Sequence, residues 1–255
     1  MVQQVLVGDD GHGARTLTLA RPHRLNAITM DMITQLEAAL GAAMTDTAVR
    51  VIVLRGEGRA FCAGDDVDEQ AGICAAGEES LRAQLSILQS ISAHLMFGPK
   101  LSICAVQGWA IGAGMSWALN CDWAIWGKTA IGFFPEVTLG THTTGGASAL
   151  LPLIVGSRLG REMLFRGKRI GADEALANNI ASQIVADDAL DEATSSLASE
   201  LASLPPDAAV RMKQALAAVH ATVLRDVLAQ EVEACVATTL NAATIARMRA
   251  TTHVT

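Results

Sequence analysis

The first regular pattern of apolar positions lies in the N-terminal quarter of the chain. Two runs rich in β-branched residues and bounded by Gly or Pro, at 16–20 and 49–56, predict strands. Between them, apolar residues recur at helical spacing, and Thr29 stands where an N-cap is expected. The unit is therefore strand, helix, strand, and the buried face of the helix is expected to hold Met32, Ile33, Leu36, Leu40 and Ala43.

The pattern continues as an alternation of helices and strands. A Gly-punctuated loop, GEGRAFCAGDDV (56–67), precedes an amphipathic helix around 79–95 and a buried strand at 101–108. The apolar stretch AIGAGMSWALNCD (110–122) then leads into a short strand, WAIW (123–126). This alternation predicts an α/β core.

The rest of the chain has a mostly helical pattern. Residues 145–185 predict short helices with a strand near 181–185, and 189–247 predict helices interrupted at the LPPD sequence. We therefore expect a core domain over 1–195 and a helical C-terminal region over 196–255.

Composition narrows the possible partners. The chain has 255 residues, of which 51% are hydrophobic, so it can fill a sizeable core. Its net charge is −7 and its Lys and Arg residues are scattered, so nucleic acid is not an expected partner. Five cysteines without CxxC spacing argue against a disulfide framework and a zinc site, and favour a reducing, cytoplasmic compartment. The N-terminus lacks the pattern of a signal peptide.

The most apolar segment, 101–126, raises the alternative of a membrane span. Its polar interruptions argue against one, because polar side chains are costly in a lipid-exposed helix, and its glycines suggest turns. The interruptions are Gln107, Asn120 and Asp122. No membrane span is expected.

A second alternative is a serine hydrolase. The sequence GMSWA (114–118) comes close to the G-x-S-x-G elbow, which would make Ser116 a nucleophile. The elbow requires a strand directly before it, and 108–113 has too many glycines to predict one. Nothing in the sequence places His142 or His220 next to the serine.

A third interpretation is an anion site. Gly112 and Gly114 permit close approach of a ligand, and a helix starting there presents unpaired N–H groups and its positive dipole end. These groups suit an oxyanion, and a second donor is available in FCAGDDV (61–67). Two tight turns without a function fit the residues equally well.

Family resemblance separates these alternatives. Five segments resemble, in order and spacing, those of the enoyl-CoA hydratase/isomerase family, the crotonases, and the match covers about 15–190. The resemblance implies a spiral of ββα units, a helical C-terminal trimerisation region and an acyl-CoA thioester substrate, without a metal or nicotinamide cofactor. The segments are RPHRLNAI (21–28), VIVLRGEGRAFCAGDDV (51–67), VQGWAIGAGMSWALNCDWAI (106–125), FPEVTLG (134–140) and ALANNIASQIV (175–185).

The resemblance also implies where the thioester lies. In the family, its oxygen sits between two backbone N–H groups, which fall on Asp65 and Ala113 here; Ala63, Gly64 and Gly112 belong to the same two turns. Asp65 departs from the family, which usually has a small or apolar residue there. Its side chain is expected either to turn away or to take part in proton transfer.

The family's two acid/base positions are only half retained. Hydratases place glutamates at both, and this chain has Ser116 at the first and Glu136 at the second. Glu136 follows two phenylalanines and a proline, and an apolar pocket would raise its pKa toward the range useful for a base. A single glutamate resembles the double-bond isomerases. Serine with glutamate resembles the hydroxycinnamoyl-CoA hydratase-lyases, although this chain has none of the tyrosines associated with those enzymes.

Other departures concern the acyl group and CoA. The segment 139–148 lacks the family's proline and is made polar by His142 and three threonines, so a polar acyl group or an acid/base role for His142 stays open beside a merely solvated turn. The expected contact of the CoA phosphates is Arg24; Arg21, His23 and Lys100 are further candidates, each of which could equally be a surface charge. Asn179, where the family often has Gly, is expected to adopt a left-handed conformation.

We therefore expect a cytoplasmic enzyme of enoyl-CoA hydratase or isomerase type. By the resemblance it is a homotrimer or a dimer of trimers, although 233–255 lack the family's usual terminal pattern. The alternative from another class is a family member that binds CoA without turnover, which the missing glutamate would explain.

Overall fold

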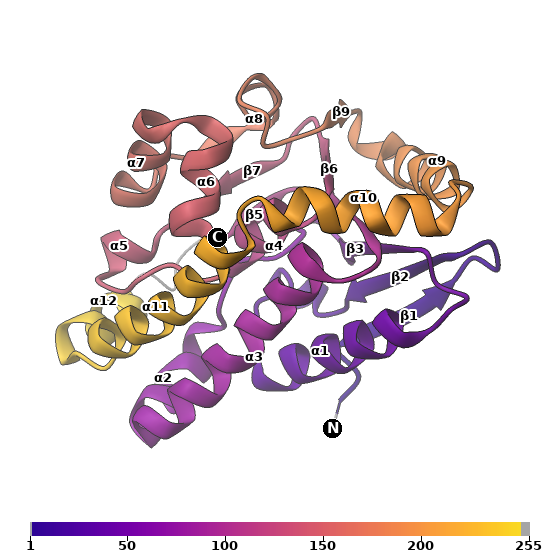
Figure 1. Ribbon diagram of the computed structural model, residues 1–255. Helices are drawn as coiled ribbons and strands as arrows, with labels where there is room; N and C mark the ends of the chain where they lie inside the picture. Colours follow the sequence, from indigo (N-terminus) through magenta and orange to yellow (C-terminus); the bar gives the residue numbers. More distant parts are fainter. Residues whose placement is uncertain (1, 251–255) are drawn as a thin grey trace.

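The computed structural model describes residues 2–250 and has an α/β architecture, as the sequence predicts (Figure 1). The main sheet has the strand order β1-β2-β3-β4-β6-β9. β1 and β2 are antiparallel, and every other neighbouring pair is parallel. Its strands are β1 (Val5–Asp9), β2 (Ala14–Leu19), β3 (Val51–Gly56), β4 (Leu101–Val106), β6 (Trp123–Gly127) and β9 (Gln183–Val185).

A smaller sheet lies beyond the ends of these strands and carries the site described below. Its order is β5-β7-β8, with β5 parallel to β7 and β8 antiparallel to it. Its strands are β5 (Trp109–Ile111), β7 (Ile131–Phe133) and β8 (Ile170–Gly171).

Helices cover both faces of the main sheet. The side chains of Ile52 and Leu54 enter the large core beneath the first helices, whereas Val51 and Val53 pack against α9 on the other face. The helices are α1 (Met30–Thr45), α2 (Val67–Ala76), α3 (Glu78–Phe97), α4 (Ala113–Asn120), α5 (Glu136–Leu139), α6 (Ala147–Val155), α7 (Ser157–Arg166), α8 (Ala172–Ala177), α9 (Leu190–Ala202), α10 (Pro206–Ala218), α11 (Ala221–Thr239) and α12 (Ala242–Ala250).

Local chemistry explains the best-predicted element, α1. The Thr29 hydroxyl accepts a hydrogen bond from the Met32 N–H at 3.1 Å, so the predicted N-cap is confirmed. The five residues predicted to face the core are the buried residues of this helix. Asn179 also adopts the predicted left-handed conformation, with φ of 62° just after α8.

Three elements differ from the sequence prediction. β1 is exposed except at Val5, so it has no alternation to reveal it. α2 falls where only a loop was recognised, and it is held by the Asp66 carboxylate, which caps its first N–H groups. The expectation that 108–113 holds no strand is wrong, because Gly108 and Gly112, both with positive φ, bracket β5 rather than interrupt it.

The C-terminal helices pack onto the core of their own chain. α11 contacts α3 and α6, and α12 contacts α2 and α5. α9 runs through position 195, and the division into 1–195 and 196–255 stays a prediction whose last five residues lie outside the described chain. Within residues 2–250, no helix has both the length and the apolarity needed to cross a membrane.

Candidate active site

Two glycine turns lie side by side at the ends of β3 and β5. The Cys62 N–H donates to the Trp109 carbonyl, and the Ile111 N–H donates back to the Cys62 carbonyl, both at 2.9 Å. Gly64 has φ of 78°, and a Cβ there would lie 3.1 Å from the Ile111 oxygen. Only glycine therefore meets both the conformation and the close approach that join the two turns.

Each turn ends in an unpaired backbone N–H. Around Asp65 the neighbouring groups are paired, because Ile28 donates to the Gly64 carbonyl and accepts from the Asp66 N–H. The Asp65 N–H itself has no acceptor within residues 2–250, and neither has that of Ala113, the first residue of α4. Both residues line the same hollow, so two free donors border it.

The hollow holds about 390 Å³ of space, counting its open mouth. Leu81, Leu85 and Leu88 of α3 form an apolar wall. The other lining residues are Asp65, Gln70, Gln84, Ala113, Glu136, Thr141, His142, Thr144, Cys235, Thr239 and Met248.

Glu136 begins α5 and directs its carboxyl group toward Gly112. A Cβ on Gly112 would lie only 2.7 Å from Glu136 Oε1, so glycine makes room for this carboxyl group. Its Oε2 is buried and has no partner in the described part of the chain. Burial raises the pKa of Glu136 to about 8, and the negative charges of Asp65 and Glu231 add to the shift.

Asp65 is the second ionisable carboxyl group at the hollow. The residue is exposed on its open side, but surrounding protein limits its hydration. This desolvation, with the charges of Glu69 and Asp66, raises the pKa of Asp65 to about 6.

Ser116 lies behind the wall of the hollow. It is 1% exposed, and its hydroxyl donates to the Thr144 carbonyl at 2.8 Å. It is not among the residues that line the hollow within the described chain. The hydroxyl pairs with a backbone carbonyl rather than with a histidine, which removes the geometric basis for a serine nucleophile.

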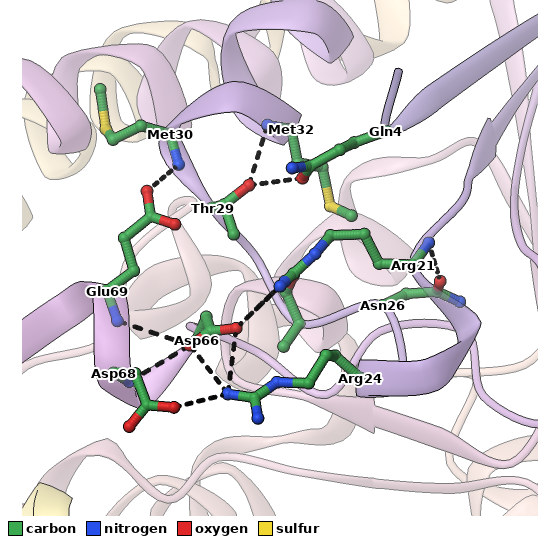
Figure 2. A network of polar contacts seen from close by, with 11 residues as sticks. Gln4, Arg21, Arg24, Asn26, Thr29, Met30, Met32, Asp66, Asp68 and Glu69 are labelled. Atoms are coloured by element: carbon green, nitrogen blue, oxygen red, sulfur yellow. Dashed lines mark hydrogen bonds and ion pairs between the residues drawn. The ribbon is translucent and has the colours of Figure 1, made fainter. Parts of the chain in front are cut away.

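An ion-pair network supports the Asp65 turn from outside (Figure 2). Arg21 donates to Asp66 Oδ2 from both terminal nitrogens at 3.1 Å, and Arg24 donates to Asp66 and, at 2.8 Å, to Asp68. Burial opposes ionisation, but the two guanidinium groups hold the pKa of Asp66 below its usual value. The network therefore holds Asp66, the residue directly after Asp65, in one position.

The residues that the sequence offers as contacts of the CoA phosphates differ in their ion pairs and in their exposure. Arg21 is committed to Asp66 and to the Ala27 carbonyl. The Arg24 side chain is paired with Asp66 and Asp68 but is 45% exposed, and Arg24 is not among the described residues that line the hollow. Lys100 precedes β4, at the end of the sheet away from the hollow, and donates to the carbonyls of residues 46 and 49. The structure therefore does not bring Lys100 to this site.

Sequence reasoning missed the contribution of α3 and α11 to the hollow. Gln84, Cys235 and Thr239 are polar or small residues on amphipathic helices, where such positions normally face solvent. Gln84 and Thr239 are nevertheless buried. Their roles depend on the tertiary contact between these helices and the turn at 141–144, for which the sequence carries no local signal.

Known proteins resemble this chain along most of its length. A family model described as enoyl-CoA hydratase/isomerase matches residues 10–248. The chain is 37% identical over 216 residues to a 2,3-dehydroadipyl-CoA hydratase of Escherichia coli (strain K12), covering 84% of this chain and 82% of that protein. It is 32% identical over 205 residues to a 1,2-epoxyphenylacetyl-CoA isomerase of the same strain, covering 80% and 78%.

A solved structure agrees in fold as well. The enoyl-CoA hydratase from Mycobacterium avium subsp. paratuberculosis K-10 superposes with a TM-score of 0.89 at 26% identity. The superposition covers 98% of this chain and 99% of that one. The similarity therefore extends over the core and the C-terminal helices together.

Proposed function

The chain belongs to the enoyl-CoA hydratase/isomerase family and has its crotonase-like fold, and on that premise we propose that it forms a thioester enolate by proton transfer at C2. The observation that carries the proposal is the pair of unpaired N–H groups, on Asp65 and Ala113, beside the buried carboxyl group of Glu136. In this proposal the thioester oxygen accepts hydrogen bonds from both donors.

The physical basis is the charge that develops on that oxygen. When a base removes the C2 proton, the electron pair moves toward the thioester oxygen, where fixed donors stabilise it better than water. Loss of one such donor typically slows a reaction by about 10²-fold or more. The free N–H groups of the two turns are suited to this task because they need no reorganisation.

Glu136 is the proposed proton carrier. Its ionised carboxylate accepts the C2 proton of a 3-enoyl thioester. The resulting acid delivers the proton to C4, which moves the double bond from C3–C4 to C2–C3 and restores the carboxylate, whereas return of the proton to C2 regenerates the substrate. The raised pKa of Glu136 makes the carboxylate a stronger base than an ordinary glutamate. Double-bond isomerisation is therefore the activity that the geometry supports best.

Hydration is the second candidate. In this second proposal Asp65, which lines the hollow with Glu136, supplies a second acid/base, because the buried Ser116 hydroxyl is paired with a backbone carbonyl. Of the two relatives named above, one is a hydratase of an unsaturated acyl-CoA and the other an isomerase of an epoxy acyl-CoA, so hydration is found at this level of similarity. Hydratase-lyase chemistry remains a subordinate proposal because it also adds water to the double bond.

Membership of the family also suggests which residues contact the CoA part and the thioester of the substrate. We propose that Arg24 contacts a CoA phosphate and that Ala63, Gly64 and Gly112 form the walls along the thioester. Local cations are needed because the chain as a whole is acidic. A homotrimer or a dimer of trimers is the assembly proposed by family resemblance.

Product analysis in ¹⁸O-labelled water tests the proposal. Purified protein is incubated with cis-3-hexenoyl-CoA and with trans-2-hexenoyl-CoA, and the products are resolved by mass. Isobaric conversion of the cis-3 substrate supports isomerisation, and ¹⁸O-labelled 3-hydroxyhexanoyl-CoA supports hydration.

Variants assign the activity to the site. Glu136→Gln is expected to lose turnover while binding the thioester, and the exposed Glu57→Gln serves as its control. Binding without turnover by the wild-type protein would contradict an enzyme and favour the CoA-binding alternative.

A further inference from the structure

The inner end of the hollow is unusually polar for a site that takes an acyl chain. Thr141, His142 and Thr144 approach from the turn after α5, and Thr239 approaches from α11. The hydroxyls of Thr141 and Thr239 hydrogen-bond to each other. One hydroxyl of this pair donates and the other accepts. Within residues 2–250 the Thr144 hydroxyl and one nitrogen of the His142 ring have no hydrogen-bond partner, and the ring nitrogen is the stronger acceptor of the two.

The backbone fixes the position and the tautomer of His142. Its Nδ1 lies 2.8 Å from the Thr143 carbonyl, and a carbonyl can only accept, so Nδ1 carries the proton. The Cys235 thiol donates to the His142 carbonyl at 3.0 Å and ties the turn to α11. With the proton on Nδ1, Nε2 is the ring nitrogen left for a ligand, and no partner of Nε2 is found within residues 2–250.

The charged groups around the hollow limit which kind of acyl group can bind next to His142 Nε2. Asp65 and Glu136 contribute carboxyl groups, and no lysine or arginine lines the hollow among the described residues. A terminal carboxylate on the acyl chain would find no cation among these lining residues and would share the hollow with Asp65, the more readily ionised of the two carboxyl groups. A plain alkyl chain would displace water from Nε2 and leave its lone pair unpaired, which is also costly.

We infer that the protein selects acyl-CoA thioesters whose acyl chain carries a neutral hydroxyl group, which donates a hydrogen bond to Nε2 of His142. This inference rests on the proposed function, because it concerns the acyl group of the same thioester. A site built to pair with a hydroxyl discriminates strongly against the analogue that lacks it. His142 is thus a residue that determines specificity and takes no part in the proton transfer at C2.

Binding measurements on saturated thioesters test the inference separately from turnover. Isothermal titration compares hexanoyl-CoA, its 4-, 5- and 6-hydroxy derivatives and adipyl-CoA on the full chain. At least one hydroxy derivative is expected to bind about tenfold more tightly than hexanoyl-CoA, as one added hydrogen bond predicts, and adipyl-CoA is expected to bind more weakly.

Variants of His142 connect the preference to Nε2. His142→Phe keeps a ring without the acceptor and should remove the preference while hexanoyl-CoA binds as before. His142→Gln, whose amide retains an acceptor, should restore part of it. The exposed His12→Leu is the control and should leave every affinity unchanged.

The outcomes separate the two proposals. If hexanoyl-CoA binds and no hydroxy derivative binds more tightly, or if the preference survives in a folded His142→Phe variant, the hydroxyl inference is overturned and the proposed function stands. If no thioester binds, the proposed function fails and the inference fails with it. If His142→Phe does not fold, the wild-type series and His142→Gln decide the question.

Discussion

Gly112 shows how a single residue joins conformation and chemistry. Its φ is 55°, its N–H donates to the Phe133 carbonyl, and the space where a Cβ would stand is taken by the carboxyl group of Glu136. Alanine here would strain the backbone and displace the proposed proton carrier. The neighbouring N–H of Ala113 would move with it.

Gly112→Ala is therefore expected to reduce kcat/KM by about 10²-fold, the size of effect seen when one fixed donor is lost. Steady-state rates with the better hexenoyl-CoA substrate measure this. Gly41→Ala is the matched control, because a Cβ at Gly41, inside α1, meets no atom within 4 Å. That variant should keep full activity and gain up to about 1 kcal/mol of stability. Equal rates for both variants would remove Gly112 from the account.

The raised pKa of Glu136 predicts how the rate of the reaction depends on pH. A base must be ionised, and with a pKa of about 8 only a minor fraction of Glu136 is ionised at pH 7. The value of kcat/KM should rise roughly tenfold between pH 7 and pH 9 and then level off. A profile that is flat over this interval would contradict Glu136 as the base.

The same pKa predicts a cost in stability. In the folded state the pKa of Glu136 is raised from its usual value of 4.5 to about 8. The contribution of Glu136 to the free energy of unfolding is therefore most favourable below about pH 4.5 and is lost as the pH rises through 8. Glu136→Gln removes the charge, so at pH 8 the Tm of this variant should exceed that of the wild type by a few degrees. At pH 4.5 the two proteins should differ little.

The family resemblance implied that Glu136, Asp65 and Ala113 belong to one site, and the structure brings all three to one hollow. The sequence could not predict where the Ser116 hydroxyl points. That orientation depends on the Thr144 carbonyl and on Gly145, whose absent Cβ would lie 2.6 Å from Ser116 Cβ. Such contacts between distant residues have no counterpart in local spacing.

At the scale of elements, a side chain of α11 caps the N-terminus of α6. Glu231 is 1% exposed, and its carboxylate accepts from the N–H groups of Gly146 and Ser148 and from the Ser148 hydroxyl, at 2.7–3.0 Å. Gln89 of α3 also donates to it. A residue near the C-terminus thereby caps the helix that follows the polar turn of the hollow.

Glu231→Ala is expected to lower the free energy of unfolding by about 1–3 kcal/mol, because it leaves buried N–H groups unpaired. Denaturant titration measures this. Glu233→Ala, two residues along the same helix, removes only the exposed pair with Arg82 and should change stability little. Similar losses for both variants would show that the cap contributes nothing specific.

The predictability of elements follows the strength of their patterns. α1 and α3 have long apolar faces and were predicted within a few residues of their ends. The sequence does not predict β1, which is an exposed edge strand, or α2, whose apolar residues are mostly small, form no single face and include a glycine among them. These weak elements are held by tertiary contacts, such as the pairing of β1 with β2 and the capping of α2 by Asp66.

Across the whole molecule, a buried lysine joins the C-terminal helices to the core. Lys213 of α10 is 4% exposed, and its Nζ donates to the carbonyls of Leu95 and Lys100 and to the Asp122 carboxylate, at 2.7–2.8 Å. These partners lie at the end of α3, at the start of β4 and before β6. One side chain thus connects three segments that are far apart in the sequence.

Lys213→Met is expected to destabilise the protein by about 3 kcal/mol, because the Asp122 carboxylate and two carbonyls lose their donor. Thermal unfolding measures the change. Lys128→Met, which removes an exposed pair with Asp173, is the control and should have a small effect. An equally stable Lys213→Met variant would mean that packing alone holds α10 to the core.

The most direct test of the central claim is proton exchange at C2 of a saturated thioester. Hexanoyl-CoA is incubated with the protein in D₂O, and its mass is followed over time. The wild-type protein is predicted to incorporate deuterium at C2, an exchange that reports enolate formation alone. Glu136→Gln is predicted to bind the thioester without this exchange. Failure of the wild-type protein to exchange this proton, or undiminished exchange by Glu136→Gln, would contradict the account.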